Sequence, residues 1–330
     1  MGRIMFHIVI TCMFVLSAND LYARDGVTLG TGTPGGGFVL YGDEVARVIN
    51  AVDTSLLIRP QNTKGSNENI ELLESGKLDI ALVQGEAVYE AFSGKSRPPA
   101  NLKIIAAMYA TPGMFVVRGD SPYRTISDLK GMRVAFGAQG SGLVILARYV
   151  LDGIGLDQQK DFHPVYLDRA GDGPVMIAEG RVAALWGGGT GWPGFTVVSK
   201  AQRGARFIAP DAGEISRILT KYPFLKQMTV PADSYPGQNS PITSVGSWSF
   251  ILARPALPDD VAYRVARAMH HSEDRLCKTL TQACGTTMAN LVSVFTRPEL
   301  IHPGVMLYLR EISRDVNYPV NKLMSRSSKH

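Results

Sequence analysis

The chain alternates short apolar segments with amphipathic helical segments, and this alternation restricts the fold more than any other feature. Strand-like runs at residues 27–31, 56–59 and 80–83 are separated by segments with helical periodicity. The first helical pattern places one apolar face at Phe38, Tyr41, Val45, Val48 and Ile49. This order predicts a parallel sheet covered by helices on both faces.

A second alternating unit follows a strand predicted at residues 114–118. Its strands are predicted at residues 133–136, 162–167 and 182–186, with a helical stripe that Gly155 ends. Residues 231–241 are rich in turn formers, and residues 247–254 form another extended run. Beyond Pro258 the patterns are helical to about residue 314. The chain therefore contains two α/β units and a helical end.

Extended segments near residues 115 and 245 connect the two units. We expect one lobe to contain residues 24–115 and 246–330, and the other to contain residues 116–245. The chain would then cross between the lobes twice and form a hinge. Ligands in open α/β sheets bind at the carboxyl ends of strands, so two facing sheets create a cleft.

The N-terminus has the composition of a secretory signal peptide. Arg3 precedes residues 4–16, which are almost wholly apolar, and small residues follow at Ala18 and Ala23. The apolar run is too short to span a bilayer. We predict a signal peptide over residues 1–23 and a mature protein in the periplasm that begins at Arg24, with cleavage after Ala18 as the alternative.

Two cysteines remain once Cys12 leaves with the signal peptide. An even number in an exported chain favours a disulfide between Cys277 and Cys284. In one unbroken helix their Cα atoms would lie about 10 Å apart, too far to bridge. The bond therefore requires a helix break within residues 278–283; otherwise the two thiols are free.

Three glycine-rich loops follow predicted strands directly, at residues 30–37, 62–66 and 137–142. Ser66 and Ser141 stand where a helix cap is expected. Glycine lets the backbone approach a ligand, and a helix start offers free N–H groups and a positive dipole end. One such loop could be an ordinary strand-to-helix connection, but three at corresponding positions favour a shared small-ligand site.

The same loops do not favour an enzyme. Gly30, Gly32 and Gly35 fit the dinucleotide pattern G-x-G-x-x-G, but the acidic residue expected at the end of the second strand is missing. Ser141 lies in Gly-Ser-Gly rather than in a nucleophile elbow, and no histidine–acid pair is identifiable as its partner. We expect no catalytic activity and no cofactor.

Charge and histidine placement disfavour two further classes. The net charge of +5 is small for 330 residues, and the basic residues are scattered between acidic ones, apart from Lys322, Arg326 and Lys329 in the C-terminal tail. This distribution does not indicate nucleic-acid binding. The six histidines show no helical ligand spacing near carboxylates, so no metal site is expected.

Several motifs occur in a familiar order along the chain. They are residues 33–38 with Tyr41 and Gly42, residues 63–69, 73–84, 128–134, 140–142, 179–182 and 235–238. Together they resemble the TAXI family of solute receptors for TRAP-type transporters, from about residue 27 to about residue 270. The resemblance implies a type II periplasmic binding protein: two doubly wound α/β lobes with a hinge and a central ligand cleft.

The resemblance also implies a ligand class and partners. The ligand would be a small carboxylate, such as a glutamate-like amino acid, a dicarboxylate or a keto acid, delivered to integral TRAP membrane subunits. Residues 84–86 read Gln-Gly-Glu where the family commonly has Gln-Ser-Asp, and residues 186–193 are richer in glycine than expected. The receptor of an ATP-driven importer and an exported α/β enzyme remain open alternatives. We expect a monomer.

The expected mechanism is capture by closure of the two lobes. The ligand carboxylate would lie against the helix starts of the three loops, where Thr33, Ser66 and Ser141 donate hydroxyl hydrogen bonds. Membrane subunits would recognise the closed form. The predicted ligand-binding residues are Thr33, Gly35, Gly36, Phe38, Tyr41, Thr63, Gly65, Ser66, Gln84, Gln139, Ser141, Gly142, Gly189, Thr190 and Trp192.

Overall fold

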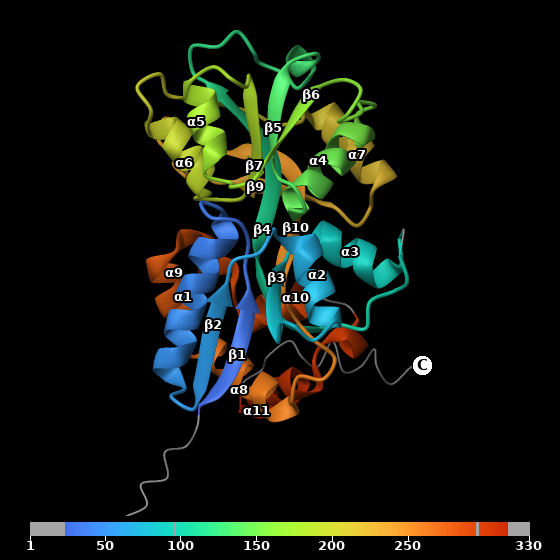
Figure 1. Cartoon of the computed structure of the whole chain (residues 1–330), viewed down its shortest axis with the longest axis vertical. Helices are drawn as coiled ribbons and strands as arrows, with labels where there is room; N and C mark the ends of the chain where they lie inside the picture. The colour runs from blue at the N-terminus through green and yellow to red at the C-terminus, as the bar shows by residue number, and fades with distance from the viewer. Residues whose placement is uncertain (1–23, 96, 295–296, 316–330) are drawn as a thin grey trace, which may run out of the picture.

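The computed structural model describes residues 24–95, 97–294 and 297–315, and Figure 1 shows how they are arranged. The predicted signal peptide lies outside these described residues. Within them, no helix has the length and apolar character needed to cross a membrane.

The first unit has the predicted alternation of strands and helices. Its elements are β1 (Asp25–Gly30), α1 (Gly37–Val52), β2 (Leu56–Gln61), α2 (Ser66–Glu74), β3 (Ile80–Val83) and α3 (Gly85–Ser93). Strand β1 lies between β2 and β3 and is parallel to both. All four residues of β3 are buried, because helices cover both faces of this sheet.

Two long strands connect this unit to the rest of the molecule. They are β4 (Lys103–Arg118) and β10 (Ile242–Ala253), which pair antiparallel. From Gly113 onward β4 pairs instead with β7 (Ala184–Gly188) and β8 (Ala205–Ile208). Strand β4 therefore joins the two sheet regions, and the strand order is β2-β1-β3-β10-β4-β7-β5-β6.

The second unit is built around β5 (Arg133–Ala138), which lies parallel between β6 (His163–Leu167) and β7. Figure 1 shows helices on both sides of these strands. The remaining elements are α4 (Gly142–Gly153), α5 (Asp172–Ala178), α6 (Pro193–Lys200), α7 (Ala212–Lys221), β9 (Lys226–Val230) and the short 3-10 helix η1 (Ser127–Leu129). α4 packs against α7, and α5 against α6.

The C-terminal helices return to the first unit. They are α8 (Asp259–His270), α9 (Glu273–Thr279), η2 (Thr281–Gly285), α10 (Met288–Val294), η3 (Pro298–Leu300) and α11 (Pro303–Asp315). α8 packs against α1 and α11 (Figure 1). The described chain beyond Pro258 thus contains the helices that the sequence predicts.

The two cysteines form a disulfide in this region, with Cα atoms 4.2 Å apart. Helix α9 ends at Thr279, Leu280 is extended, and η2 begins at Thr281. The helix therefore breaks inside the predicted segment, which brings Cys277 and Cys284 within bonding distance.

Candidate functional site

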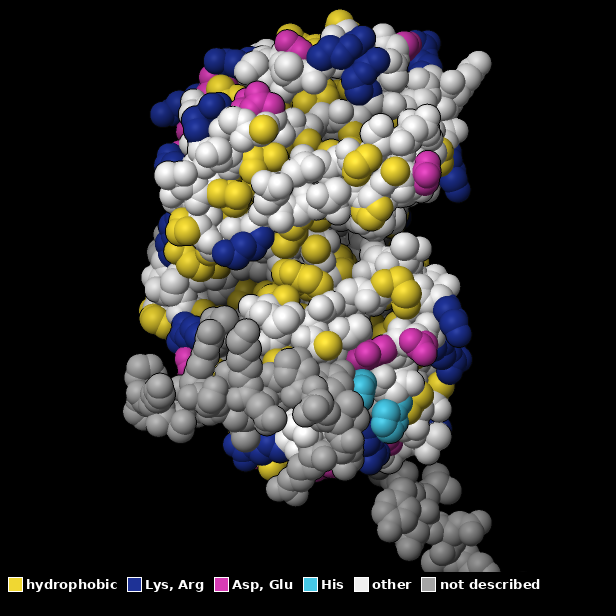
Figure 2. Space-filling view, turned by 180° about the vertical axis from the view of Figure 1, so that it is seen from behind, with side chains coloured by type: hydrophobic (Ala, Val, Ile, Leu, Met, Phe, Trp, Pro, Cys, Tyr) yellow, Lys and Arg dark blue, Asp and Glu magenta, His cyan; other side chains and the backbone are white. Residues whose placement is uncertain are grey.

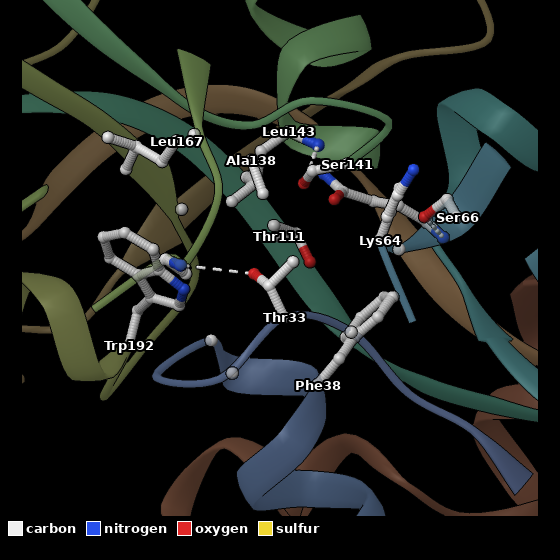
Figure 3. A pocket seen from close by; sticks show the side chains of 18 of the residues that line it. Thr33, Phe38, Lys64, Ser66, Thr111, Ala138, Ser141, Leu143, Leu167 and Trp192 are labelled. Atoms are coloured by element: carbon white, nitrogen blue, oxygen red, sulfur yellow. Dashed lines mark hydrogen bonds between the residues drawn. The ribbon is translucent and has the colours of Figure 1, made fainter. Parts of the chain in front are cut away.

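A cavity of about 70 Å³ lies where the two units meet, at the carboxyl ends of β1, β2, β3, β5 and β7. Figure 3 shows side chains from both units facing it. Seen from behind relative to Figure 1, Figure 2 shows hydrophobic side chains gathered between the upper and lower halves of the molecule. The cavity is lined by Gly32, Thr33, Gly36, Gly37, Phe38, Lys64, Gly65, Ser66, Gln84, Tyr109, Thr111, Gly137, Ala138, Ser141, Leu143, Leu167, Ala170, Gly188, Trp192 and Gln282.

The loop between β1 and α1 forms one wall of the cavity. The Thr33 hydroxyl accepts a hydrogen bond of 3.2 Å from the backbone N–H of Ala170 in the second unit (Figure 3). Gly35 has a φ of +83°, and a Cβ atom there would lie 2.6 Å from the backbone of Gly171. Only glycine fits this approach, so Gly35 brings the two units together without lining the cavity itself.

The loop between β2 and α2 supplies Lys64, Gly65 and Ser66. Ser66 was expected to cap the helix, and that expectation is wrong, because α2 begins at Ser66 itself and Gly65 is the N-cap. The buried Ser66 hydroxyl instead accepts a 3.1 Å hydrogen bond from the backbone N–H of Gln84, at the end of β3. The hydroxyl therefore ties two loops of the first unit together at the cavity.

The loop between β5 and α4 lies opposite. Ser141 is the N-cap of α4, and its hydroxyl accepts a 3.2 Å hydrogen bond from the backbone N–H of Leu143. Gly142 lies directly beneath Gln84, where an added Cβ would come within 2.4 Å of the Gln84 Cβ. Ser141 thus caps its helix and lines the cavity at the same time (Figure 3).

Trp192 forms the far side of the cavity and explains the glycine-rich segment before it. A Cβ at Gly187 or Gly194 would lie within 3 Å of the Trp192 ring. The glycines leave space for the indole ring. The backbone N–H of Trp192 donates a 3.0 Å hydrogen bond to the Tyr235 hydroxyl. That hydroxyl donates to the carbonyl oxygen of Gly189 at 2.7 Å, which fixes the loop.

Several predicted residues lie outside the cavity lining. Tyr41 is fully buried beneath it and bonds to the Thr286 hydroxyl at 2.9 Å. The Thr63 hydroxyl donates to the carbonyl oxygen of Thr31 at 3.2 Å. The residues that do not line the cavity are Gly35, Tyr41, Thr63, Gln139, Gly142, Gly189 and Thr190, whereas Thr33, Gly36, Phe38, Gly65, Ser66, Gln84, Ser141 and Trp192 do.

Gln139 lies in a neighbouring outer cavity of about 440 Å³. This outer cavity shares Thr33, Lys64 and Leu167 with the inner one, and its other walls carry carboxylates. The residues that only the outer cavity has are Glu68, Glu71, Gln139, Gly140 and Asp168. Lys64 therefore stands between an acidic outer space and the inner cavity.

Three polar side chains of the inner cavity come from places the sequence did not indicate. Tyr109 and Thr111 belong to the interior of β4, and Gln282 belongs to η2 in the C-terminal helical region. Burial raises the pKa of Tyr109, so its hydroxyl stays protonated near neutral pH. Lys64 lies within a loop that the sequence singled out, but only the structure shows it at the cavity.

The cavity wall has few charges. Lys64 is its one Lys or Arg residue, and no described residue that lines it is Asp, Glu, His or Cys. No group of three potential metal ligands occurs among the described residues. The wall offers hydroxyl, amide and ammonium donors beside apolar surface from Phe38, Leu143 and Leu167, and this combination suits a small ligand with anionic oxygens.

Comparisons with known proteins place the fold in a recognised class. A family model described as the NMT1-like family matches residues 29–312. The periplasmic binding protein BugD superposes with a TM-score of 0.56 at 11% identity, covering 88% of this chain and 96% of that chain. A structure described as a periplasmic transporter gives a TM-score of 0.53 at 15% identity, covering 80% and 88%.

A third structure is described as the substrate binding protein of an amino acid ABC transporter. It gives a TM-score of 0.47 at 14% identity and covers 77% of this chain and 98% of that chain. The α/β architecture of a type II periplasmic binding protein, which the sequence predicts, is confirmed by the strand arrangement and by the likeness of fold to BugD and the periplasmic transporter.

Proposed function

The chain belongs to the NMT1-like family, and from this premise we propose that it is an exported solute-binding receptor for a membrane importer. It captures a small organic anion in the inner cavity and releases it to membrane subunits. The observation that carries this proposal is the cavity itself, whose walls come from strand-to-helix loops of both α/β units. A closed site between two units is what capture requires.

We take the two units as lobes with the predicted limits, residues 24–115 with 246–330 and residues 116–245. In support, β4 changes partners between Pro112, which pairs with β10, and Gly113, which pairs with β7. Among the described strands, β10 and β4 lie side by side where the two sheet regions join in the strand order. A bend of these two strands would open the cleft.

Direct hydrogen bonds cross the cleft and support a closed state. The backbone N–H of Gly171 donates to the carbonyl oxygen of Pro34 at 3.2 Å, beside the bond between Ala170 and Thr33. The backbone N–H of Asn67 donates to the carbonyl oxygen of Gly140 at 3.1 Å. These bonds must break before a ligand can enter, so binding and closure are coupled.

The ligand class follows from the donors that the wall leaves free. The hydroxyl oxygens of Thr33, Ser66 and Ser141 each accept a backbone N–H, so each O–H can donate to a ligand. Lys64 adds a positive charge, and the described lining of the inner cavity contains no Asp or Glu, because the neighbouring carboxylates line the outer cavity. We propose a small carboxylate: a glutamate-like amino acid, a dicarboxylate or a keto acid.

Two transporter classes fit this role. The matching family is the NMT1-like family rather than the TAXI family that the loop motifs resemble, so we rank an ATP-driven importer first. Delivery to TRAP membrane subunits is the second candidate, and the ordered loop motifs favour it. Neighbouring genes for an ATPase and a permease would support the first, and genes for the two TRAP subunits the second.

Calorimetric titration tests the receptor function. We expect the purified protein to bind one of glutamate, 2-oxoglutarate or succinate with one-to-one stoichiometry and without turning it over. Lys64→Met should weaken that binding about two- to tenfold, because it removes one charge at the cavity mouth. Lys77→Met, at an exposed turn after α2, is the matched control and should leave the affinity unchanged.

Two results would contradict the proposal. Failure of every carboxylate to bind the wild-type protein would exclude the ligand class. Chemical conversion of a bound compound, detected by mass spectrometry of the solution, would instead support an exported α/β enzyme.

A further inference from the structure

Gln282 is a polar side chain of the inner cavity that, like Tyr109 and Thr111, comes from outside the strand-to-helix loops. It lies on η2, in the C-terminal helical region, and is 9% exposed. Its Nε2 atom is buried and has no hydrogen-bond partner among the described residues. A buried amide donor without a partner is unfavourable. Because Gln282 lies in the cavity wall, a ligand oxygen can accept the hydrogen bond that its amide does not make within the protein.

The disulfide encloses this residue in a small covalent ring. Cys277 lies in the last turns of α9, Cys284 lies in η2, and Gln282 is two residues before Cys284. Inside the ring, the backbone N–H of Ala283 donates to the carbonyl oxygen of Leu280 at 2.8 Å. The ring therefore limits the conformations open to Gln282.

The residues just after the ring fix it against the wall of the cavity. The Thr286 hydroxyl donates to the carbonyl oxygen of Met108 on β4 at 2.8 Å, one residue before Tyr109 in the cavity wall. Because that bond uses the only Thr286 hydroxyl hydrogen, the Tyr41 hydroxyl donates to Thr286. The side-chain amide of Asn290 donates to the carbonyl oxygen of Gly285 at 2.8 Å.

We propose that Gln282 is a ligand-binding residue and that the Cys277–Cys284 disulfide is a positioning element that holds its amide at the cavity. This proposal rests on the receptor function above. The Nε2 group donates a hydrogen bond to an anionic oxygen of the bound carboxylate. The ligand thus contacts the C-terminal helical region as well as the loops of both α/β units.

The first test compares Gln282→Ala with Thr281→Ala, an exposed neighbour in η2 that does not line the cavity. Titration uses whichever of glutamate, 2-oxoglutarate or succinate the wild-type protein binds. Gln282→Ala should weaken binding roughly ten- to hundredfold, because it removes one hydrogen bond to a charged group. Thr281→Ala should not change it, and Gln282→Ala should not lower the ligand-free melting temperature.

The outcomes separate this inference from the receptor function. Unchanged affinity in Gln282→Ala, with a wild-type protein that binds, overturns the role of Gln282 and leaves the receptor function standing. A wild-type protein that binds none of the probes overturns both.

A second test addresses the disulfide through a double-mutant cycle. Replacing both cysteines with serine should weaken binding several-fold when Gln282 is present. The same replacement should cause no further loss in the Gln282→Ala background, because the disulfide acts on binding through that side chain. Equal losses in both backgrounds would overturn the positioning role.

Discussion

Glu86 shows how a single residue links the cavity to the strands between the lobes. Its side chain is fully buried on the first turn of α3, two residues after Gln84, which lines the cavity. Its carboxyl group accepts a 2.7 Å hydrogen bond from the hydroxyl of Ser247 on β10. Burial raises the pKa of Glu86 to about 7, although the bond from Ser247 works against this shift.

The raised pKa of Glu86 predicts a pH dependence of stability. Between its ordinary value of 4.5 and about 7, the folded protein binds more protons than the unfolded chain. The free energy of unfolding should therefore fall as the pH rises through this window, by up to about 3 kcal/mol, and level off above it. Glu86→Gln should remove this component. Thermal melts of the wild-type protein and Glu86→Gln between about pH 5 and about pH 8 measure this component. If stability depends on pH in the same way in both proteins, the prediction is refuted.

At the residue scale, the sequence indicated some cavity residues and missed others for a physical reason. Hydroxyl and glycine residues in loops mark a helix start, so Thr33 and Ser141 were recognisable. Tyr109 and Gln282 lie in a strand interior and in a short 3-10 helix, where local pattern does not reveal which side chain faces a cavity. Their positions depend on the packing of distant segments.

At the scale of elements, the long strand β4 departs most from expectation. The sequence predicts a strand only at residues 114–118, whereas β4 begins at Lys103. Pro112 and Gly113 look like a break because proline donates no backbone hydrogen bond and glycine favours turns. In the structure Pro112 is the last residue of β4 that pairs with β10, and Gly113 is the first that pairs with β7. The two residues therefore lie where β4 changes its partner and do not end the strand.

Shorter elements were missed for a different reason. β8 and β9 have four and five residues, and α5 has seven. Such short segments give too few positions for a periodic pattern to emerge. The long helices α1 and α4 carry the apolar stripes that the sequence shows, and the structure has helices at these positions.

A contact between α3 and the segment after α7 gives a prediction at this scale. The ring of Tyr89 on α3 stacks on Phe224, with centroids 3.9 Å apart and planes 6° from parallel. Because the proposed lobes each supply one ring, we expect the stack to form on closure. Phe224→Ala should then weaken ligand binding about two- to tenfold, equivalent to about 0.5–1.5 kcal/mol.

Calorimetric titration of Phe224→Ala measures the ligand affinity, and a thermal melt of the same variant measures its stability. Tyr89→Phe keeps the stacked ring and is the matched control, so it should bind like the wild-type protein. An unchanged affinity in Phe224→Ala would show that the stack is present in the open state as well.

At the scale of the whole molecule, the alternation of strands and helices was sufficient to predict the fold class. It could not reveal how the C-terminal helices reach the cavity, because the contact between η2 and β4 joins residues far apart in sequence. Several hydrogen bonds, the stacked pair of rings and the cavity all lie between the same two units. Capture of a ligand by closure accounts for them together.

Small-angle X-ray scattering with and without ligand tests that account most directly. The ligand-free protein should sample open forms with a larger radius of gyration than the structure described above. Saturation with the carboxylate that binds in titration should shrink the particle until its scattering matches this closed structure. Identical scattering curves with and without saturating ligand would contradict capture by closure.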